Sequence, residues 1–191
     1  MKDSSLKPKI GVMGSAGDVL TESDRLRLLE IAKLLGEIIA DRGCVLVTGA
    51  TTGLPDLVSR AARSRGGLTI GISPAFSKQE HVDCYNLPTD GADVIIYTGF
   101  GLKGRNVINI RSSDIVIIFG GGMGALNEFT IAYDEGKVIG VLDGSGGIAD
   151  HLREIVDFAK KQTHSQLIYN SNPETLIDLC LQALSTRMSE T

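Results

Sequence analysis

The sequence predicts a single-domain α/β fold of the Rossmann-like type, a doubly wound, mostly parallel sheet with helices on both faces. Two observations predict it. Short runs rich in Val and Ile, without polar alternation, recur along the 191 residues and are typical of strands covered on both faces. Stretches of helical periodicity lie between most of these runs. Since no linker or repeat interrupts this alternation, one domain is expected at residues 9–185, between short disordered tails at 1–8 and 186–191.

Seven apolar runs are expected to form the strands, and the longest predicted helix follows the first of them. Between residues 24 and 41, Leu28, Ile31 and Leu35 recur at spacings of three and four, which predicts a helix with one apolar face behind a cap at Thr21. The expected strands are residues 10–13, 45–47, 68–72, 94–97, 115–119, 138–142 and 167–169.

Three further helices are expected along the chain. Two shorter stretches, at 54–65 and 126–135, each follow a glycine-rich turn. Near the C-terminus, Asn172 is a candidate cap for a helix over 176–184, with a proline in the first turn. The segment 76–93 has no clear period, so it is either a lid or interface segment or a variable surface loop.

The composition is that of a globular protein with a mildly acidic charge. Lys and Arg number 19 against 23 Asp and Glu, for a net charge of −4, and 42% of residues are hydrophobic, which excludes a disordered chain. Basic residues cluster only at Arg60, Arg63 and Arg65, so no nucleic-acid partner is expected. Without an apolar run of about 20 residues or a signal-peptide pattern, a cytoplasmic protein with no membrane partner is expected. The odd cysteine count favours reduced thiols, with Cys44 and Cys180 in the core.

Glycine marks the candidate ligand site. Among 23 glycines, three clusters follow apolar runs, at 14–17, 49–53 and 120–124. Glycine lets the backbone approach a ligand, and a helix N-terminus offers free N–H groups and the positive end of its dipole, so phosphate is the expected guest. The clusters could instead be ordinary tight turns, but the convergence of three at one sheet edge favours a site. The residues expected to hold the ligand are Gly14, Ser15, Gly49, Thr51, Thr52, Gly53, Gly121, Gly122, Met123, Gly124 and Ala125.

Other kinds of site are not indicated. The first cluster lacks the G-x-G-x-x-G dinucleotide fingerprint, and no Gly-Lys-Ser/Thr follows any cluster, which disfavours NAD binding and nucleoside triphosphate hydrolysis. His81, His151 and His164 lack metal-ligand spacing, so no metal site is expected. Lys103 and Lys137 lie nearest the clusters, but no motif supports a Schiff-base lysine, so a pyridoxal-dependent decarboxylase is not expected.

Charged side chains flank the third glycine cluster. Glu128 lies four residues after Gly124 and is expected on the first turn of the following helix. Arg105, Asn106 and Arg111 precede the strand that leads into the cluster, and an arginine pair is a good phosphate clamp because each planar guanidinium donates two parallel hydrogen bonds. Taken alone, these residues could instead be a first-turn acid favoured by the helix dipole and arginines in surface ion pairs.

Together the residues resemble a known family. The segment from Gly120 to Glu128, Gly-Gly-Gly-Met-Gly-Ala-Leu-Asn-Glu, resembles the P-G-G-x-G-T-x-x-E motif of the Lonely Guy (LOG) family, whose members were long mislabelled as lysine decarboxylases. Arg105, Asn106 and Arg111 fall at that family's spacing upstream, and the similarity extends over about residues 9–143. Within the superfamily, the segments around the second glycine cluster look closest to the molybdenum cofactor carrier branch.

The resemblance implies a phosphate pocket formed by the glycine loops and a homodimer or homotetramer. In the hydrolase branch it implies cleavage of a nucleoside 5′-monophosphate to free base and ribose 5-phosphate, with Arg105 and Glu128 as the catalytic pair and no cofactor required. Ala125 replaces the motif Thr and Gly120 the motif Pro, which removes a hydroxyl contact to phosphate. The sequence therefore predicts a protein that binds a phosphorylated nucleotide or pterin-type ligand, as a carrier with molybdenum cofactor as cargo or as a nucleotide-binding protein; the alternative is a LOG-like phosphoribohydrolase.

Overall fold

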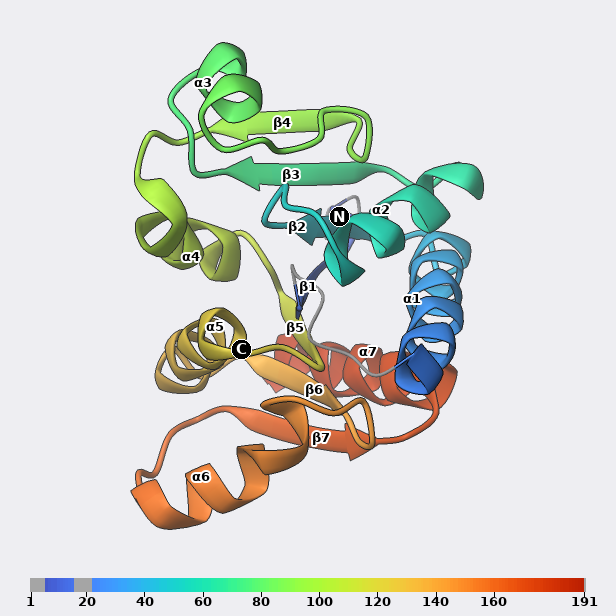
Figure 1. Ribbon diagram of the computed structural model, residues 1–191. Helices are drawn as coiled ribbons and strands as arrows, with labels where there is room; N and C mark the ends of the chain where they lie inside the picture. The colour runs from blue at the N-terminus through green and yellow to red at the C-terminus, as the bar shows by residue number, and fades with distance from the viewer. Residues whose placement is uncertain (1–5, 16–21, 191) are drawn as a thin grey trace.

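A seven-stranded, wholly parallel sheet forms the centre of the protein in the computed structural model, which describes residues 6–15 and 22–190 (Figure 1). The strand order is β4-β3-β2-β1-β5-β6-β7. All seven strands predicted from the sequence are present, with ends within one residue of the prediction. They are β1 (Lys9–Gly14), β2 (Val45–Thr48), β3 (Thr69–Ser73), β4 (Val94–Tyr97), β5 (Ile115–Phe119), β6 (Val138–Leu142) and β7 (Gln166–Asn170).

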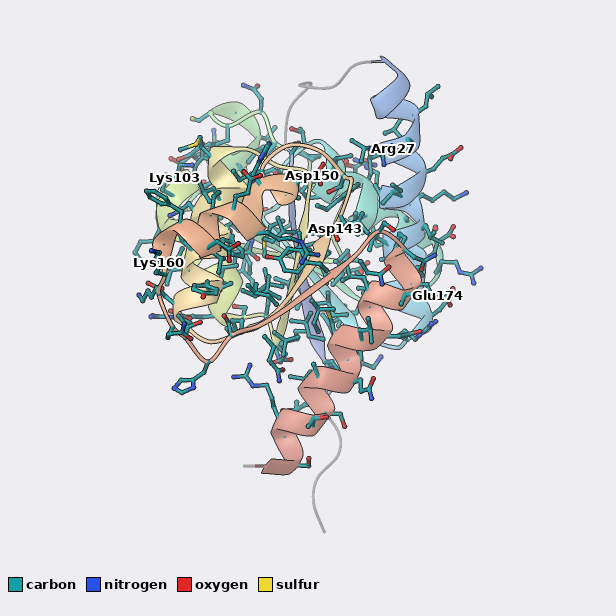
Figure 2. The ribbon with its side chains drawn as sticks, turned by 90° about the horizontal axis from the view of Figure 1, so that it is seen from below. Arg27, Lys103, Asp143, Asp150, Lys160 and Glu174 are labelled. Atoms are coloured by element: carbon teal, nitrogen blue, oxygen red, sulfur yellow. The ribbon has the colours of Figure 1, made fainter. Side chains whose placement is uncertain are left out.

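Helices cover both faces of the sheet, as the doubly wound prediction requires. On one face lie α1, α2 and α7, and on the other lie α4, α5 and α6 (Figure 1). Seen from below, Lys103 of α4 and Glu174 of α7 lie on opposite sides of the molecule (Figure 2). The helices are α1 (Glu22–Asp41), α2 (Leu54–Ser64), α3 (Lys78–Asp83), α4 (Gly101–Arg111), α5 (Met123–Asp134), α6 (Leu152–Ala159) and α7 (Pro173–Glu190), with a 3₁₀ turn at Ala149–His151.

Strand β5 shows how the apolar runs build this architecture. All five of its residues are buried, and they alternate between two apolar clusters. Ile115 and Ile117 belong to the cluster beneath α1, α2 and α7, whereas Val116 and Ile118 belong to the cluster beneath α4, α5 and α6. Each such side chain contributes about 1.5–3 kcal/mol through burial, which is why the run shows no polar alternation.

The order of the strands locates the crevice in which ligands of such folds bind. The chain adds β2, β3 and β4 on one side of β1, then returns to add β5, β6 and β7 on the other. The connections that leave the carboxyl ends of β1 and β5 therefore run in opposite directions, to β2 and to β6, and Gly14 of β1 pairs with Phe119 of β5 at this point. A sheet of this kind binds ligands beyond the carboxyl ends of the strands at this switch point.

Three helices were not predicted from the sequence: α3, α4 and α6. Helix α5 also begins earlier than expected, at Met123, so Glu128 lies on its second turn rather than its first. The cap predicted at Asn172 is confirmed, since its side-chain oxygen accepts a hydrogen bond of 2.9 Å from the Thr175 N–H. The predicted cap at Thr21 lies outside the described residues. Residues 186–190, expected to be a disordered tail, continue α7 as its last turns.

The segment 76–93 is held firmly against the sheet instead of standing off as an irregular loop. It contains α3, and Arg60 and Arg63 of α2 pair with Asp90 and Asp93 at 2.7 and 2.8 Å. His81 is fully buried and its two ring nitrogens lie 2.8 Å from Ser73 Oγ and 2.9 Å from the Pro88 carbonyl oxygen. These contacts make the segment part of the β3–β4 connection.

Two further observations concern the cysteines and the character of the helices. Cys44 and Cys180 are buried in the core as predicted, while Cys84 is exposed on the segment that contains α3. Within the described ranges, no helix combines the length and apolar character needed to cross a membrane.

Candidate functional site

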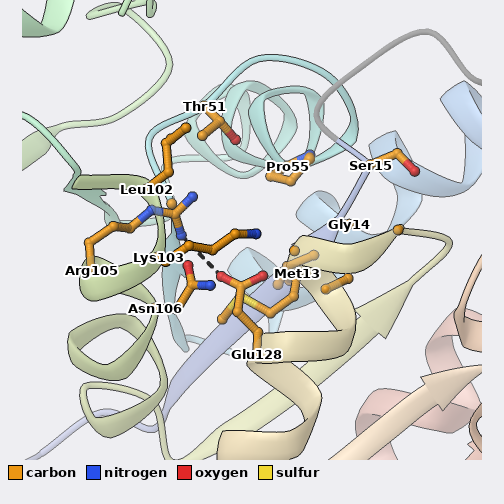
Figure 3. A pocket seen from close by; sticks show the side chains of 15 residues that line it. Met13, Gly14, Ser15, Thr51, Pro55, Leu102, Lys103, Arg105, Asn106 and Glu128 are labelled. Atoms are coloured by element: carbon orange, nitrogen blue, oxygen red, sulfur yellow. Dashed lines mark hydrogen bonds and ion pairs between the residues drawn. The ribbon is translucent and has the colours of Figure 1, made fainter.

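A pocket lies at the switch point, beyond the carboxyl ends of β1 and β2. Its volume is about 210 Å³, and Figure 3 shows the side chains that line it. The lining comes from the end of β1, the loop after β2, and the starts of α2, α4 and α5. The lining residues are Val12, Met13, Gly14, Ser15, Gly49, Thr51, Pro55, Leu102, Lys103, Arg105, Asn106, Gly122, Gly124, Ala125 and Glu128.

Three helix N-termini converge on this pocket. Helix α2 is preceded by Gly53, α4 by Phe100 and α5 by Gly122, and none of these three cap residues provides a side-chain hydrogen bond. The first N–H groups of a helix have no intrahelical acceptor, and the N-terminus carries about half a positive charge. Some of these donors are already used, since the Leu54 N–H of α2 donates to the Ser15 carbonyl oxygen and the Gly101 N–H of α4 donates to the Pro74 carbonyl oxygen. The three helix dipoles still direct positive potential at the pocket, which suits an anion.

An arginine–glutamate ion pair forms the floor of the pocket. Arg105 of α4 and Glu128 of α5 are each 9% exposed, and Arg105 Nη1 donates to Glu128 Oε1 at 3.0 Å (Figure 3). The guanidinium lies against Gly49, where a Cβ would come within 2.4 Å of it, so only glycine leaves room for this arginine. Arg105 Nε is buried and has no hydrogen-bond partner in the described parts of the chain. The arginine thus has donor capacity left over for a ligand.

Burial sets the electrostatics of this pair. Burial raises the pKa of Glu128 above its ordinary value, against the opposing effects of the Arg105 charge and of hydrogen bonds from Asn109 and Arg105. Burial also lowers the pKa of Arg105, although an arginine stays charged in a protein. A carboxyl group with a raised pKa beside a cavity is typical of a functional site, because it can exchange a proton where an exposed carboxylate would not.

The remaining polar side chains point to a net positive pocket. The Lys103 side chain extends across it from the first turn of α4 (Figure 3). Asn106 donates to Asn127 Oδ1 at 2.7 Å, and Ser15 Oγ accepts from the Gly121 N–H at 3.0 Å, which fixes the glycine loop against β1. With two cations and one carboxylate among its lining side chains, the pocket carries a positive balance before the helix dipoles are added.

Ten of the residues expected at the site lie together in the pocket, and others lie beside it. Gly121 lines a smaller cavity next to the pocket, between Ser15 and Gly147. Gly53 is the cap of α2, and Thr52 is exposed beside it. Met123 is 75% exposed and is not one of the described residues that line the pocket. The ten in the pocket are Gly14, Ser15, Gly49, Thr51, Arg105, Asn106, Gly122, Gly124, Ala125 and Glu128.

Arg111 does not join Arg105 in a clamp. It lies at the far end of α4, about 9 Å along the helix from Arg105, and its Nε pairs with Glu135 Oε1 at 2.8 Å. Its side chain is 68% exposed. The expectation of paired arginines was therefore wrong because it did not account for the helix that separates them. The second cation of the pocket is Lys103.

The sequence placed Lys103 near the glycine clusters without assigning it to the ligand site, and it gave no indication of Asn109. Asn109 is fully buried behind the pair, with its Nδ2 3.3 Å from Glu128 Oε1. It follows Arg105 by four residues, so helical spacing places both on one face of α4. That spacing was the available signal, but it is informative only once the segment is known to be a helix.

Comparison with known proteins now identifies the family. The model of the SLOG cluster4 family matches residues 7–177. The chain belongs to this family. It is 30% identical over 165 residues to a Mycobacterium marinum protein named cytokinin riboside 5'-monophosphate phosphoribohydrolase, covering 80% of this chain and 85% of that one. The membership confirms the resemblance to the LOG superfamily.

Two solved structures share the fold of this chain, and their similarity places the chain near the molybdenum cofactor carrier branch of the superfamily. The molybdenum cofactor binding protein of Rippkaea orientalis is 35% identical, with a TM-score of 0.75 over 95% of this chain and 99% of that one. The molybdenum cofactor carrier protein of Chlamydomonas reinhardtii is 27% identical, with a TM-score of 0.73 over 94% of this chain and 99% of that one. Among the described residues, no group of three His, Cys, Asp or Glu side chains is placed to hold a metal ion.

Proposed function

We propose that this protein binds a phosphorylated nucleotide or a pterin-type ligand in the pocket at the strand ends, as a molybdenum cofactor carrier or a nucleotide-binding protein. The observation that carries the proposal is the convergence of three helix N-termini without side-chain caps on one cavity that also holds Arg105 and Lys103. Phosphate matches this set, since it accepts hydrogen bonds from backbone N–H groups and guanidinium together.

The carrier function is supported by the relatives and by the glycine loop. The Rippkaea orientalis protein, described as a molybdenum cofactor binding protein, is similar over nearly the whole chain. Ala125 lines the pocket where the LOG motif has a threonine, so this loop holds its ligand through backbone N–H groups without that hydroxyl. Among the described residues that line the pocket there is no cysteine, so recognition of such a cargo would act through its phosphate and ring rather than through thiolate bonds to its metal.

The second candidate is a LOG-like phosphoribohydrolase, and the buried ion pair favours it. Cleavage of a glycosidic bond passes through an oxocarbenium-like state that the Glu128 carboxylate would stabilise. Arg105, held against Glu128 at 3.0 Å, would orient the phosphate and sugar. The Mycobacterium marinum relative carries the corresponding name.

One chromatographic experiment separates the two candidates. The protein is incubated with adenosine 5′-monophosphate and close analogues, and free base and ribose 5-phosphate are measured, with Glu128→Gln as the control. Carrier function predicts binding detectable by calorimetry with no release of base. Release that disappears in Glu128→Gln would instead establish the hydrolase. Neither binding nor release, for any phosphorylated nucleotide or pterin, would refute the proposed function.

We also propose that the protein is a homodimer or homotetramer. Strand β4 is at the edge of the sheet, and Val94 and Ile96 on it are 47% and 46% exposed. By register they lie on the face that α4 and α5 cover elsewhere, and Phe100 just before α4 and Leu102 in its first turn are also exposed. An apolar face of a parallel sheet is normally covered. Sedimentation in dilute solution should give at least twice 20.3 kDa, and a single monomeric species would refute the oligomer.

A further inference from the structure

Asn109 is a buried amide that the proposed ligand site does not touch. It lies on α4 one turn beyond Arg105 and has no exposed surface. Its Nδ2 lies 3.3 Å from Glu128 Oε1 and 3.3 Å from the sulfur of Met13 on β1. Its Oδ1 is buried and has no hydrogen-bond partner within the described ranges.

This arrangement is costly for a residue that only fills space. A buried carbonyl oxygen without a donor loses its hydration and gains nothing in return. The next residue, Ile110, and the neighbouring Met13 both belong to the apolar cluster, so a leucine of nearly the same size would suit the packing better. The amide therefore contributes something that a leucine would not, and its directed contact is with Glu128.

We propose that Asn109 is a positioning residue for Glu128, whose amide N–H holds Oε1 toward Arg105 and favours the ionised carboxylate. A rotated amide would turn Oδ1 to the same oxygen and accept a hydrogen bond from the protonated acid. One side chain thus has a donor for one protonation state and an acceptor for the other. Its effect on ligand binding rests on the proposed function, but its effect on Glu128 does not.

Within the described residues, the charged groups that act on Glu128 are Arg105 and Lys103, both from α4. From β1, the uncharged Met13 contacts the Asn109 amide. Burial works in the opposite direction from these cations and favours the neutral acid. Arg105 and Lys103 are unchanged in a variant at position 109. A change in the pKa of Glu128 in such a variant is therefore assigned to loss of the Asn109 amide.

The direct test is an NMR titration of the Glu128 side-chain carboxyl carbon in the full protein, assigned by its loss in Glu128→Gln. Asn109→Leu keeps the shape and removes the hydrogen bond, and it should raise the pKa of Glu128 by about one pH unit. Asn109→Ser supplies a hydroxyl donor in place of the amide N–H, and it should therefore recover part of the shift. An unchanged titration in Asn109→Leu would overturn the proposal.

A matched control separates positioning from packing. Ile110→Val removes one buried methylene from the adjacent position of α4, so it should lower the melting temperature while leaving the Glu128 titration in place. If Asn109→Leu does not fold, Asn109→Asp replaces the amide with a carboxyl of the same shape. It should then make the two carboxyls share one proton, seen as a coupled two-step titration. Independent titrations of the two groups would overturn the proposal.

The consequence for ligand binding is tested with adenosine 5′-monophosphate as the probe. If Glu128 must be ionised to hold Arg105 in place, Asn109→Leu should shift the pH dependence of the dissociation constant upward by the same interval as the NMR titration. Failure of the wild-type protein to bind the probe would count against the proposed function. It would leave the NMR result, and with it the role of Asn109, standing.

Discussion

Two sets of arginine–carboxylate pairs in this molecule have the same chemistry and different surroundings. Arg60 and Arg63 of α2 pair with Asp90 and Asp93 on the surface, with side chains between 33% and 70% exposed. Arg105 and Glu128 pair in the pocket, each 9% exposed. Exposed pairs contribute little to stability because water screens them, whereas a buried pair carries a large desolvation cost.

The two sets of pairs differ in how many of the arginine hydrogen-bond donors have partners. On the surface, Arg60 donates through Nε and both Nη atoms to Asp56 and Asp90, and Arg63 donates to Asp93 and to the Asp90 carbonyl oxygen, and together they fix the segment 76–93 to α2. The buried arginine lines a cavity, and its Nε has no hydrogen-bond partner among the residues that the structure describes. The surface network fixes one segment of the fold, whereas the spare donor of the buried pair supports the proposal that this pair contacts a ligand.

The largest effect on ligand binding is expected at the glycine loop of the pocket. A Cβ added at Gly122 meets no heavy atom within 4 Å, so Gly122→Val should fold normally while placing its side chain in the space that the phosphate would occupy. Binding of adenosine 5′-monophosphate should fall by at least about 100-fold, or ~2.7 kcal/mol. Calorimetry measures it, with the melting temperature as control. Unchanged affinity in a folded variant would show that this loop does not bind the phosphate.

Removing one arginine from each set tests the comparison itself. Arg105→Met leaves Glu128 buried without its partner and should destabilise the protein by about 3–5 kcal/mol at neutral pH, whereas Arg60→Met should cost under about 1 kcal/mol. Urea unfolding measures both. Equal losses in the two variants would show that burial does not distinguish the pairs.

The pH dependence of the Arg105→Met variant follows from the sign of the Glu128 shift. Without the cation, the pKa of Glu128 in the folded state rises further above its unfolded value. A raised folded pKa gives stability that is present at low pH and lost as the pH rises through it. The deficit relative to wild type should therefore shrink on acidification toward the unfolded pKa of about 4.3. A deficit that stays constant would contradict this account.

A smaller effect is expected where Arg105 rests on the backbone. Gly49→Ala puts a Cβ within 2.4 Å of the guanidinium, so Arg105 must move away from its place. Adenosine 5′-monophosphate affinity should fall about tenfold, and the cost in stability should be about 1–3 kcal/mol, typical of overpacking. The control is Gly43→Ala, which has open space but left-handed backbone and lies away from the pocket. Reduced affinity in the control as well would mean that the effect is not local.

The smallest effect concerns the surface set. Burial would raise the pKa of Asp93, but hydrogen bonds from the Thr69 N–H and hydroxyl, and then from Arg63, outweigh it and hold the pKa below its ordinary value. A depressed folded pKa gives stability that is present above the unfolded pKa and lost as the pH falls through the folded value. Asp93→Asn should thus cost about 1 kcal/mol at neutral pH, after allowance for exposure, and progressively less below about pH 4. Thermal unfolding of the wild type and the variant at several pH values measures this loss of stability. A loss that does not change with pH would show that the assignment to the Asp93 carboxylate is wrong.

The strands were predictable because each is a continuous apolar run between turns, and the parallel sheet buries both faces of such a run. Helix α4 was not, and its composition explains why. Gly101 and Gly104 and the β-branched Val107 and Ile108 lower its helix propensity. Its buried face also carries Arg105, Asn106 and Asn109 in place of an apolar stripe. The helix that carries the site is therefore the one whose pattern the site obscures.

The candidate site divides in the same way. The glycine loops and the residues Arg105 and Glu128 could be predicted because their spacing along the chain is a motif. Lys103, Asn109 and the position of Arg111 could not, because they depend on the pitch and direction of α4. Arg111 and Arg105 are equally good clamp residues in one dimension, but the helix turns Arg111 toward Glu135 at its other end.

The most direct test of the central claim, that the three helix N-termini and Arg105 recognise a phosphate, compares two ligands that differ in that group alone. Adenosine 5′-monophosphate and adenosine are titrated into the wild-type protein by calorimetry at low ionic strength. The monophosphate should bind at least about tenfold more tightly than adenosine, or ~1.4 kcal/mol, and added salt should reduce this difference in affinity. Equal affinity for the two ligands would contradict phosphate recognition, because the pocket would then gain no binding energy from the phosphate group.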